Sequence, residues 1–86
     1  MSILKLYQML EEWIEQAEQG RELAHTEFSK EFSRMDIEFF GGVSERCKSP
    51  LAMKYDLCRN ALCYPMINLE ERAIMARELF GKIPQP

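Results

Sequence analysis

The first hydrophobic pattern of the chain covers residues 3–19 and has the period of an α-helix. At 100° per residue, apolar side chains fall on one face and charged or amide side chains on the other. The polar face includes Glu11, Glu12 and Glu15. The apolar face consists of Ile3, Leu6, Tyr7, Leu10, Trp13, Ile14 and Ala17. The pattern predicts an amphipathic helix, and Ser2 is a suitable N-cap for it.

A narrower apolar stripe, with members three or four residues apart, predicts a second helix over 21–40. Its members are Ala24, Phe28, Phe32, Met35 and Phe39. Two arrangements fit the glycine between the stripes. In one, Gly20 ends the first helix in the left-handed conformation and Thr26 caps the second. In the other, the stripes stay in phase across Gly20 and form one helix of about 38 residues, roughly 57 Å long. The continuous helix would need a partner chain to cover it.

Two further helices are predicted over 50–63 and 69–80, after a loop at 41–48. Ser49-Pro50 is a favoured helix start, and Asn68 with Glu71 resembles a capping box. The helix over 50–63 has two apolar stripes, one of Leu51, Tyr55, Cys58 and Leu62, the other of Met53, Leu57, Ala61 and Tyr64. A helix that is apolar on most of its circumference is usually central. We therefore expect this helix to be packed by neighbours on both sides.

These elements predict an all-α fold, a small three- to four-helix bundle, in a single domain over 1–86. Hydrophobic residues make up 47% of the 86 residues and charged residues 29%, which is ordinary for a globular domain. No stretch approaches the roughly 20 apolar residues that span a bilayer, so no membrane contact is expected. The start of the chain has none of the features of a secretory signal, which favours a cytoplasmic location.

The net charge of −3 disfavours nucleic acid as a partner, because phosphates require positive charge. The charge is concentrated near the start of the chain, where four glutamates stand against Lys5. This acidic face is either simply solvated or docks on a basic surface of another protein.

The three cysteines and the single histidine allow a second kind of function. Cys47, Cys63 and His25 could form a thiol- or metal-dependent switch, and Cys47 lies between the basic Arg46 and Lys48. The chain has no C-x₂-C pair, which is the specific part of a zinc signature. The simpler interpretation is that Cys58 is a core residue and the others are free thiols. No cofactor or bound metal is therefore expected.

The last two helices allow a third interpretation, a small helix-turn-helix DNA-binding regulator. Arg72, Arg77 and Lys82 favour it. Glu70 and Glu71 oppose it, because they would meet phosphates at the start of the recognition helix.

The function we expect is non-enzymatic binding of another protein, as a regulator, adaptor or inhibitor, with homodimer formation as one form of it. Several apolar residues lie off the core stripes or at their edges, either because they form a docking patch or because they belong to the core. The candidate partner-binding residues are Glu11, Glu12, Glu15, Ile37, Phe40 and Met75.

Overall fold

The structure is a computed structural model that describes residues 2–86, and in this part of the chain it contains helices and no strand. Four helices are long: α1 (Ile3–Glu18), α2 (Glu27–Phe40), α4 (Pro50–Cys63) and α5 (Leu69–Phe80). A single-turn helix, α3 (Val43–Arg46), lies within the segment predicted to be a loop. The predicted all-α bundle is confirmed.

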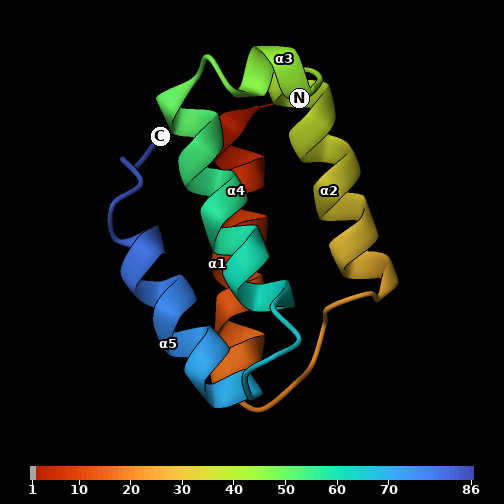
Figure 1. Ribbon diagram of the computed structural model, residues 1–86, viewed down its shortest axis with the longest axis vertical. Coiled ribbons are helices and arrows are strands. Elements are labelled where there is room, and N and C mark those ends of the chain that lie inside the picture. Colours follow the sequence, from red (N-terminus) through yellow and green to blue (C-terminus); the bar gives the residue numbers. More distant parts are fainter. Residues whose placement is uncertain (1) are drawn as a thin grey trace.

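Helix α1 contacts each of the other three long helices and lies behind α4 in the view of Figure 1. It packs against α2 on one side and against α4 and α5 on the other, whereas α4 packs mainly on α5 and α1. The contacts of α2 with the rest of the molecule are therefore chiefly with α1. The prediction that the helix over 50–63 is central, packed by neighbours on both sides, was wrong, because α2 makes few contacts with it and leaves a groove on that side.

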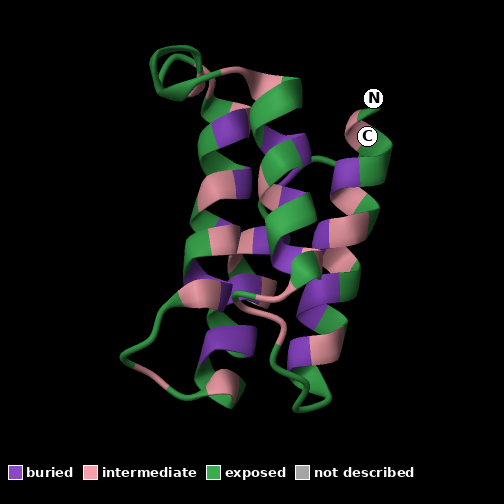
Figure 2. Cartoon of the chain, turned by 90° about the vertical axis from the view of Figure 1, so that its right-hand side faces the viewer, coloured by how far each residue is buried: buried purple, intermediate pink, exposed green. Residues whose placement is uncertain are grey.

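The core lies where the long helices face one another, and the loops at both ends are half-buried or exposed (Figure 2). The indole ring of Trp13 makes edge-to-face contacts with Phe28 at 6.1 Å and Phe32 at 5.6 Å, which attach α2 to α1. The fully or almost fully buried side chains include Leu6, Leu10, Trp13, Ile14, Phe32, Tyr55, Cys58 and Leu62. The predicted inward face of α1 is thus confirmed.

Gly20 ends α1 in the left-handed conformation, with φ +85°. The amide of Gly20 donates to the carbonyl of Ala17 at 3.0 Å, and the amide of Arg21 donates to that of Gln16 at 2.8 Å. These two bonds form a Schellman motif, which satisfies carbonyls that the helix end leaves free. Of the two arrangements that the sequence allowed, the broken one is confirmed.

The second helix begins at Glu27 instead of residue 21, because residues 19–26 form a connection tied to α5. Thr26 is the N-cap residue, but its hydroxyl donates to the carbonyl of Leu23 at 2.5 Å and does not cap the first-turn amides. Arg72, which is almost completely buried, donates to Glu22 and to the carbonyl of Leu62 at 2.7 Å. The guanidinium of Arg72, which belongs to α5, is therefore bonded both to the α1–α2 connection and to the end of α4.

At the end of α2, the residue that faces the core is not the one that the sequence predicted. Phe39, assigned to the core stripe, is 38% exposed, whereas Phe40 is half-buried and packs against the ring of Tyr55 at 5.6 Å. Phe40 faces the core in place of Phe39 because Tyr55 of α4 lies on the same side of α2 as Phe40. Gly41, with φ +88°, then ends α2.

The caps predicted for the other helices are present. Ser2 accepts a hydrogen bond from the amide of Lys5 at 3.3 Å, Ser49 from that of Ala52 at 3.2 Å, and Asn68 from that of Glu71 at 2.9 Å. These three ends could be predicted because capping is a local interaction.

Candidate functional site

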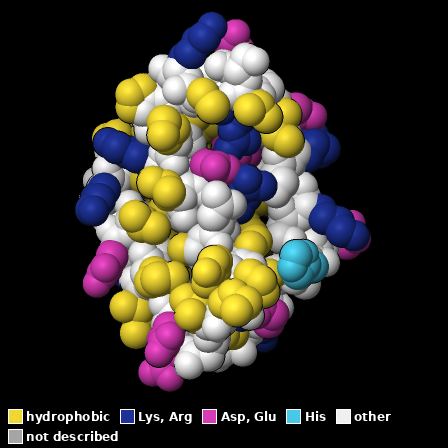
Figure 3. Space-filling model, in the orientation of Figure 1, with side chains coloured by type: hydrophobic (Ala, Val, Ile, Leu, Met, Phe, Trp, Pro, Cys, Tyr) yellow, Lys and Arg dark blue, Asp and Glu magenta, His cyan; other side chains and the backbone are white. Residues whose placement is uncertain are grey.

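Helix α4 leaves most of one of its two apolar stripes uncovered. Met53, Leu57 and Tyr64 are each about half exposed, at 52%, 51% and 50%. The sequence predicted that this stripe would be buried, but only its Ala61 is, whereas Tyr55, Cys58 and Leu62 of the opposite stripe are completely buried. Figure 3 shows hydrophobic side chains gathered along the face over α4. An uncovered row of large apolar side chains at helical spacing is typical of a surface that another molecule covers.

A groove runs beside this stripe, and we call it the α2–α4 groove. It is a cavity of about 420 Å³ between the end of α2, α3 and the first half of α4. It exists because α2 packs on α1 and hardly touches α4. The groove is lined by Ile37, Gly41, Gly42, Val43, Arg46, Cys47, Ala52, Met53, Asp56 and Arg59. Its walls are mostly apolar, and its charged groups are confined to Arg46, Asp56 and Arg59.

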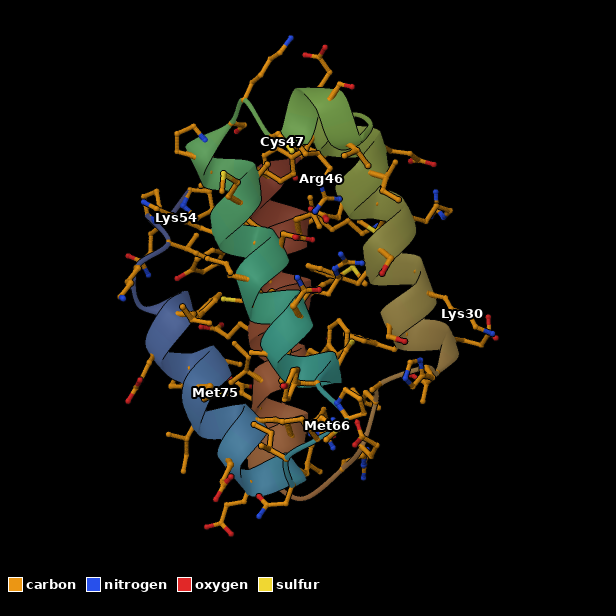
Figure 4. All side chains as sticks on the ribbon, in the orientation of Figure 1. Lys30, Arg46, Cys47, Lys54, Met66 and Met75 are labelled. Atoms are coloured by element: carbon orange, nitrogen blue, oxygen red, sulfur yellow. The ribbon has the colours of Figure 1, made fainter. Side chains whose placement is uncertain are left out.

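A chain of ion pairs crosses the groove from α2 to α4. Arg46 lies in the space between these helices, below α3 (Figure 4). Its Nη1 is 2.7 Å from Asp36 Oδ2, and its Nη2 is 2.8 Å from Asp56 Oδ1. Asp56 Oδ1 also accepts from Arg59 Nη2 at 2.5 Å, and Arg59 Nη1 donates to Ser33 at 3.4 Å. The short α3 thus carries the residue that holds α2 and α4 together at this end.

Asp36 is the most unusual group of this network, because its side chain is completely buried. Burial raises the pKa of its carboxyl above the ordinary value of 3.8, and the nearby guanidiniums of Arg46 and Arg59 offset only part of this effect. Oδ1 has no hydrogen-bond donor within residues 2–86. The neighbouring Tyr55 hydroxyl is also buried without a partner there, and burial raises its pKa to about 12. Two buried polar groups near the groove, one on α2 and one on α4, are therefore incompletely hydrogen-bonded.

Sequence reasoning missed this network, although one signal was present. Asp36 follows Phe32 by four residues, so a helix places the carboxylate on the apolar face. A charged residue in such a position implies a buried cation. The partner, Arg46, lies ten residues away in a segment that was predicted to be a loop.

The predicted partner-binding residues do not form one surface. Ile37 lines the α2–α4 groove, and Met75 is exposed on α5. Phe40 is turned inward against Tyr55. The glutamates of α1 lie outside the groove: Glu12 and Glu15 are exposed and Glu11 is half-exposed. Two separate surfaces result, one apolar and one acidic.

The cysteines differ in their surroundings. Cys58 is buried, which raises the pKa of its thiol to about 12, and burial also raises the pKa of the half-buried Cys63. Cys47 is exposed and lines the groove, and His25 lies in the α1–α2 connection. Residues 2–86 contain no group of three His, Cys, Asp or Glu side chains placed to hold a metal ion.

Two of the three basic residues that favoured DNA binding are engaged within the fold. Arg72 is buried, and Arg77 makes a two-pronged contact with Glu18 of α1, at 3.1 and 2.8 Å. The hydrogen bond from Arg77 is the main reason that the pKa of Glu18 is lowered. Both arginines connect helices of the bundle.

Comparison of the chain with known protein families, curated proteins and solved structures finds no significant match. Within residues 2–86, every helix is too short or too polar to cross a membrane.

Proposed function

We propose that this chain is a non-enzymatic protein that binds another protein through the α2–α4 groove and the apolar stripe of α4. The observation that carries the proposal is the exposure of Met53, Leu57 and Tyr64 next to an open groove with apolar walls. Full burial of a large apolar side chain is worth about 1.5–3 kcal/mol, and because these side chains are already half buried, covering each one would contribute roughly half of that before the cost of association.

The extent of the surface favours a protein over a small molecule. The lining of the groove does not include Leu57 on α4 or Tyr64 at its end, so the apolar surface is wider than the cavity. A ligand that fills only the cavity would leave these side chains in water, whereas a segment of protein lying along α4 would cover them. A regulator, adaptor or inhibitor acts through such a contact.

The proposal includes a cytoplasmic setting. Cys47, Cys58 and Cys63 are all free thiols in the structure, as is usual where the environment is reducing.

The test compares two substitutions of equally exposed apolar residues on different faces. Leu57→Glu changes the α4 stripe, and Ile74→Glu changes α5, where Ile74 is 55% exposed and lies against the end of α1. Both replace an exposed side chain in a helix, so each should alter the free energy of unfolding by no more than about 0.5 kcal/mol. The tagged wild-type chain and both variants are purified from the cells in which the protein is native.

We expect a protein that co-purifies with the wild type and with Ile74→Glu at equal amounts and is at least tenfold depleted with Leu57→Glu. Urea unfolding of each variant confirms that the fold is intact. If nothing co-purifies, or if both substitutions remove the protein equally, the α4 surface is not the binding site and the proposal fails.

A further inference from the structure

We infer that residues 41–48, which we call the strap, can move relative to α2 and α4, and that Arg46 is the latch that holds the strap in place. This role rests on the proposed function and adds its regulation, because the strap forms part of the α2–α4 groove. The binding site is complete while Arg46 is bound to both helices, and it is incomplete once the strap is released.

The strap supplies half of the lining of the groove. Five of the ten lining residues lie within residues 41–47, and the other five lie on α2 and α4. The strap, which contains α3, crosses from the end of α2 to the start of α4 at one end of the bundle (Figure 1). A change in its position therefore changes the wall that a bound segment of protein would meet.

The helical turn of the strap cannot hold itself in place. None of the four residues of α3 is buried, and Val43 is 79% exposed. The amides of residues 45–48 donate to carbonyls of residues 42–45, within the strap itself. A single helical turn is unstable in water on its own, because fixing its backbone costs more than its few hydrogen bonds return. Contacts with other helices must therefore stabilise it.

Arg46 supplies these contacts. Its side chain is only 12% exposed and pairs with Asp36 on α2 and with Asp56 on α4. Within residues 2–86, no other side chain of residues 42–48 makes a hydrogen bond or ion pair with another helix. Because Asp36 is completely buried, Arg46 reaches it only from a position between the two helices, as Figure 4 shows. The ion pair with Asp36 therefore fixes one position of the strap.

The two ends of the strap differ in their freedom. At its start, Gly41 has φ +88°, and Gly42 follows with open space around the position of a Cβ atom. Two consecutive glycines allow the backbone to change direction at little steric cost. At the other end, Ser49 caps α4 by accepting from the amide of Ala52 at 3.2 Å. The strap can therefore turn at its glycines while α2 and α4 keep their places.

The test separates the latch from the stability of the fold. Arg46→Ala removes the guanidinium, but alone it leaves the carboxylate of Asp36 buried without a cation and destabilises the whole domain. The double variant Asp36→Asn/Arg46→Ala removes both charges, and Asp56 keeps its contact with Arg59. The matched control is Arg34→Ala, which removes an arginine of α2 from its exposed pair with Glu38.

Two measurements are made on the full chain. Hydrogen exchange of backbone amides, followed by NMR, reports the strap at residues 45–48 and the core at Leu10 and Ile14 of α1. Co-purification from the native cells reports the binding site, with the protein that depends on Leu57 as its readout. Each variant is compared with the wild type.

In the double variant we expect the strap amides to exchange roughly tenfold faster than in the wild type, because release of the latch lets the single turn unfold locally. The amides of Leu10 and Ile14 should keep their exchange rates. Capture of the Leu57-dependent protein should fall by about the same factor as with Leu57→Glu. Arg34→Ala should change neither measurement.

Three results would overturn the inference. Strap amides that exchange as slowly in the double variant as in the wild type would mean that Arg46 is not the latch. Equal acceleration of the strap and of α1 would mean that the pair supports the whole fold. A released strap with undiminished capture would mean that the strap is not part of the binding site, and the proposed function would stand.

Failure of the proposed function appears in a different comparison. Leu57→Glu and Ile74→Glu leave Arg46 and Asp36 intact, so equal capture by these two variants counts against the α4 surface and not against the latch. If the wild type captures nothing, the regulatory part of the inference fails with the proposed function, while the exchange rates still decide whether Arg46 holds the strap.

Discussion

At the scale of single residues, the buried carboxylate of Asp36 is the group on which the groove depends. Its ion pair with Arg46 joins α2 to α3, and the second contact of Arg46, with Asp56, continues to α4. Removing two charges from water is unfavourable, so a buried pair contributes little net stability, but the loss of one member leaves an uncompensated charge. The network therefore fixes the position of α2 more than it stabilises the fold.

The first prediction concerns this pair. Arg46→Met should lower the free energy of unfolding by about 3–5 kcal/mol at neutral pH, because it leaves the carboxylate of Asp36 buried without a cation. Adding Asp36→Asn should restore most of the loss. The control is Arg34→Met, which removes the exposed pair with Glu38 and should change stability by less than about 1 kcal/mol. Urea unfolding measures all three variants, and equal destabilisation by the single and double variants would show that the two groups are not coupled.

The second prediction is the dependence of stability on pH. The pKa of Asp36 is raised by folding, so the folded chain binds its proton more tightly than the unfolded chain. The unfavourable contribution of the charged carboxylate is present above the folded pKa and is lost as the pH falls through it toward the ordinary value of 3.8. Relative to Asp36→Asn, the wild type should therefore gain stability between pH 7 and pH 4.

The comparison with Asp36→Asn is needed because other carboxyls act in the opposite direction. The pKa of Glu18 is lowered, mainly by its hydrogen bond from Arg77, so its stabilising contribution is lost on acidification. Taking the difference between wild type and variant at each pH removes such contributions. A wild type that loses stability relative to the variant on acidification would mean that the charged form of Asp36 is favoured by the fold.

At the scale of helices, the decisive feature is the end of α1. Because Gly20 adopts a left-handed conformation, the chain reverses and α2 returns along α1. The apolar stripe of α1 is then covered within the same chain. The continuous helix, which was the structural reason to expect a homodimer, is thereby removed.

The third prediction tests this turn. Gly20→Ala should lower the free energy of unfolding by about 1 kcal/mol, because an L side chain is strained at φ +85° although no atom would touch its Cβ. The matched control is Gly42→Ala, where the space is equally open and φ is −72°. That change should be neutral or slightly stabilising. If Gly20→Ala is instead as stable as the wild type and doubles in mass, the continuous helix is accessible to this chain.

Much of the helical layout could be predicted from the sequence, because caps and apolar periodicity are local. Ser2, Ser49 and Asn68 mark helix starts that the structure has, and the inward face of α1 is correct. The choice at Gly20 could not be made from phase alone, since both arrangements keep the stripes aligned.

The sequence alone could not predict which of the two apolar stripes of α4 packs against another helix. The two stripes of α4 are similar in composition, and only the positions of α1 and α5 decide that Tyr55 is buried while Leu57 is exposed. The partner of Asp36 is likewise set by the path of residues 41–48. The candidate site therefore consists of one predicted residue, Ile37, and a groove that appears only when the helices are assembled.

At the scale of the whole molecule, the bundle has two unlike surfaces. The glutamates of α1 form an acidic surface, and the α2–α4 groove with the α4 stripe forms an apolar surface. The packing of Trp13 on Phe28 and Phe32, the Schellman turn and the Arg72 contacts hold α1, α2 and α5 together. None of these contacts covers the α4 stripe, which is why we propose that another protein does.

The most direct test of this account is the mass of the purified chain in solution, measured by light scattering at two protein concentrations. The account predicts a 10.1 kDa monomer at both, with the groove open to a different protein. The variant Leu57→Glu should have the same mass. A dimer that becomes a monomer on Leu57→Glu would contradict the account, because the α4 stripe would then be covered by a second copy of the chain.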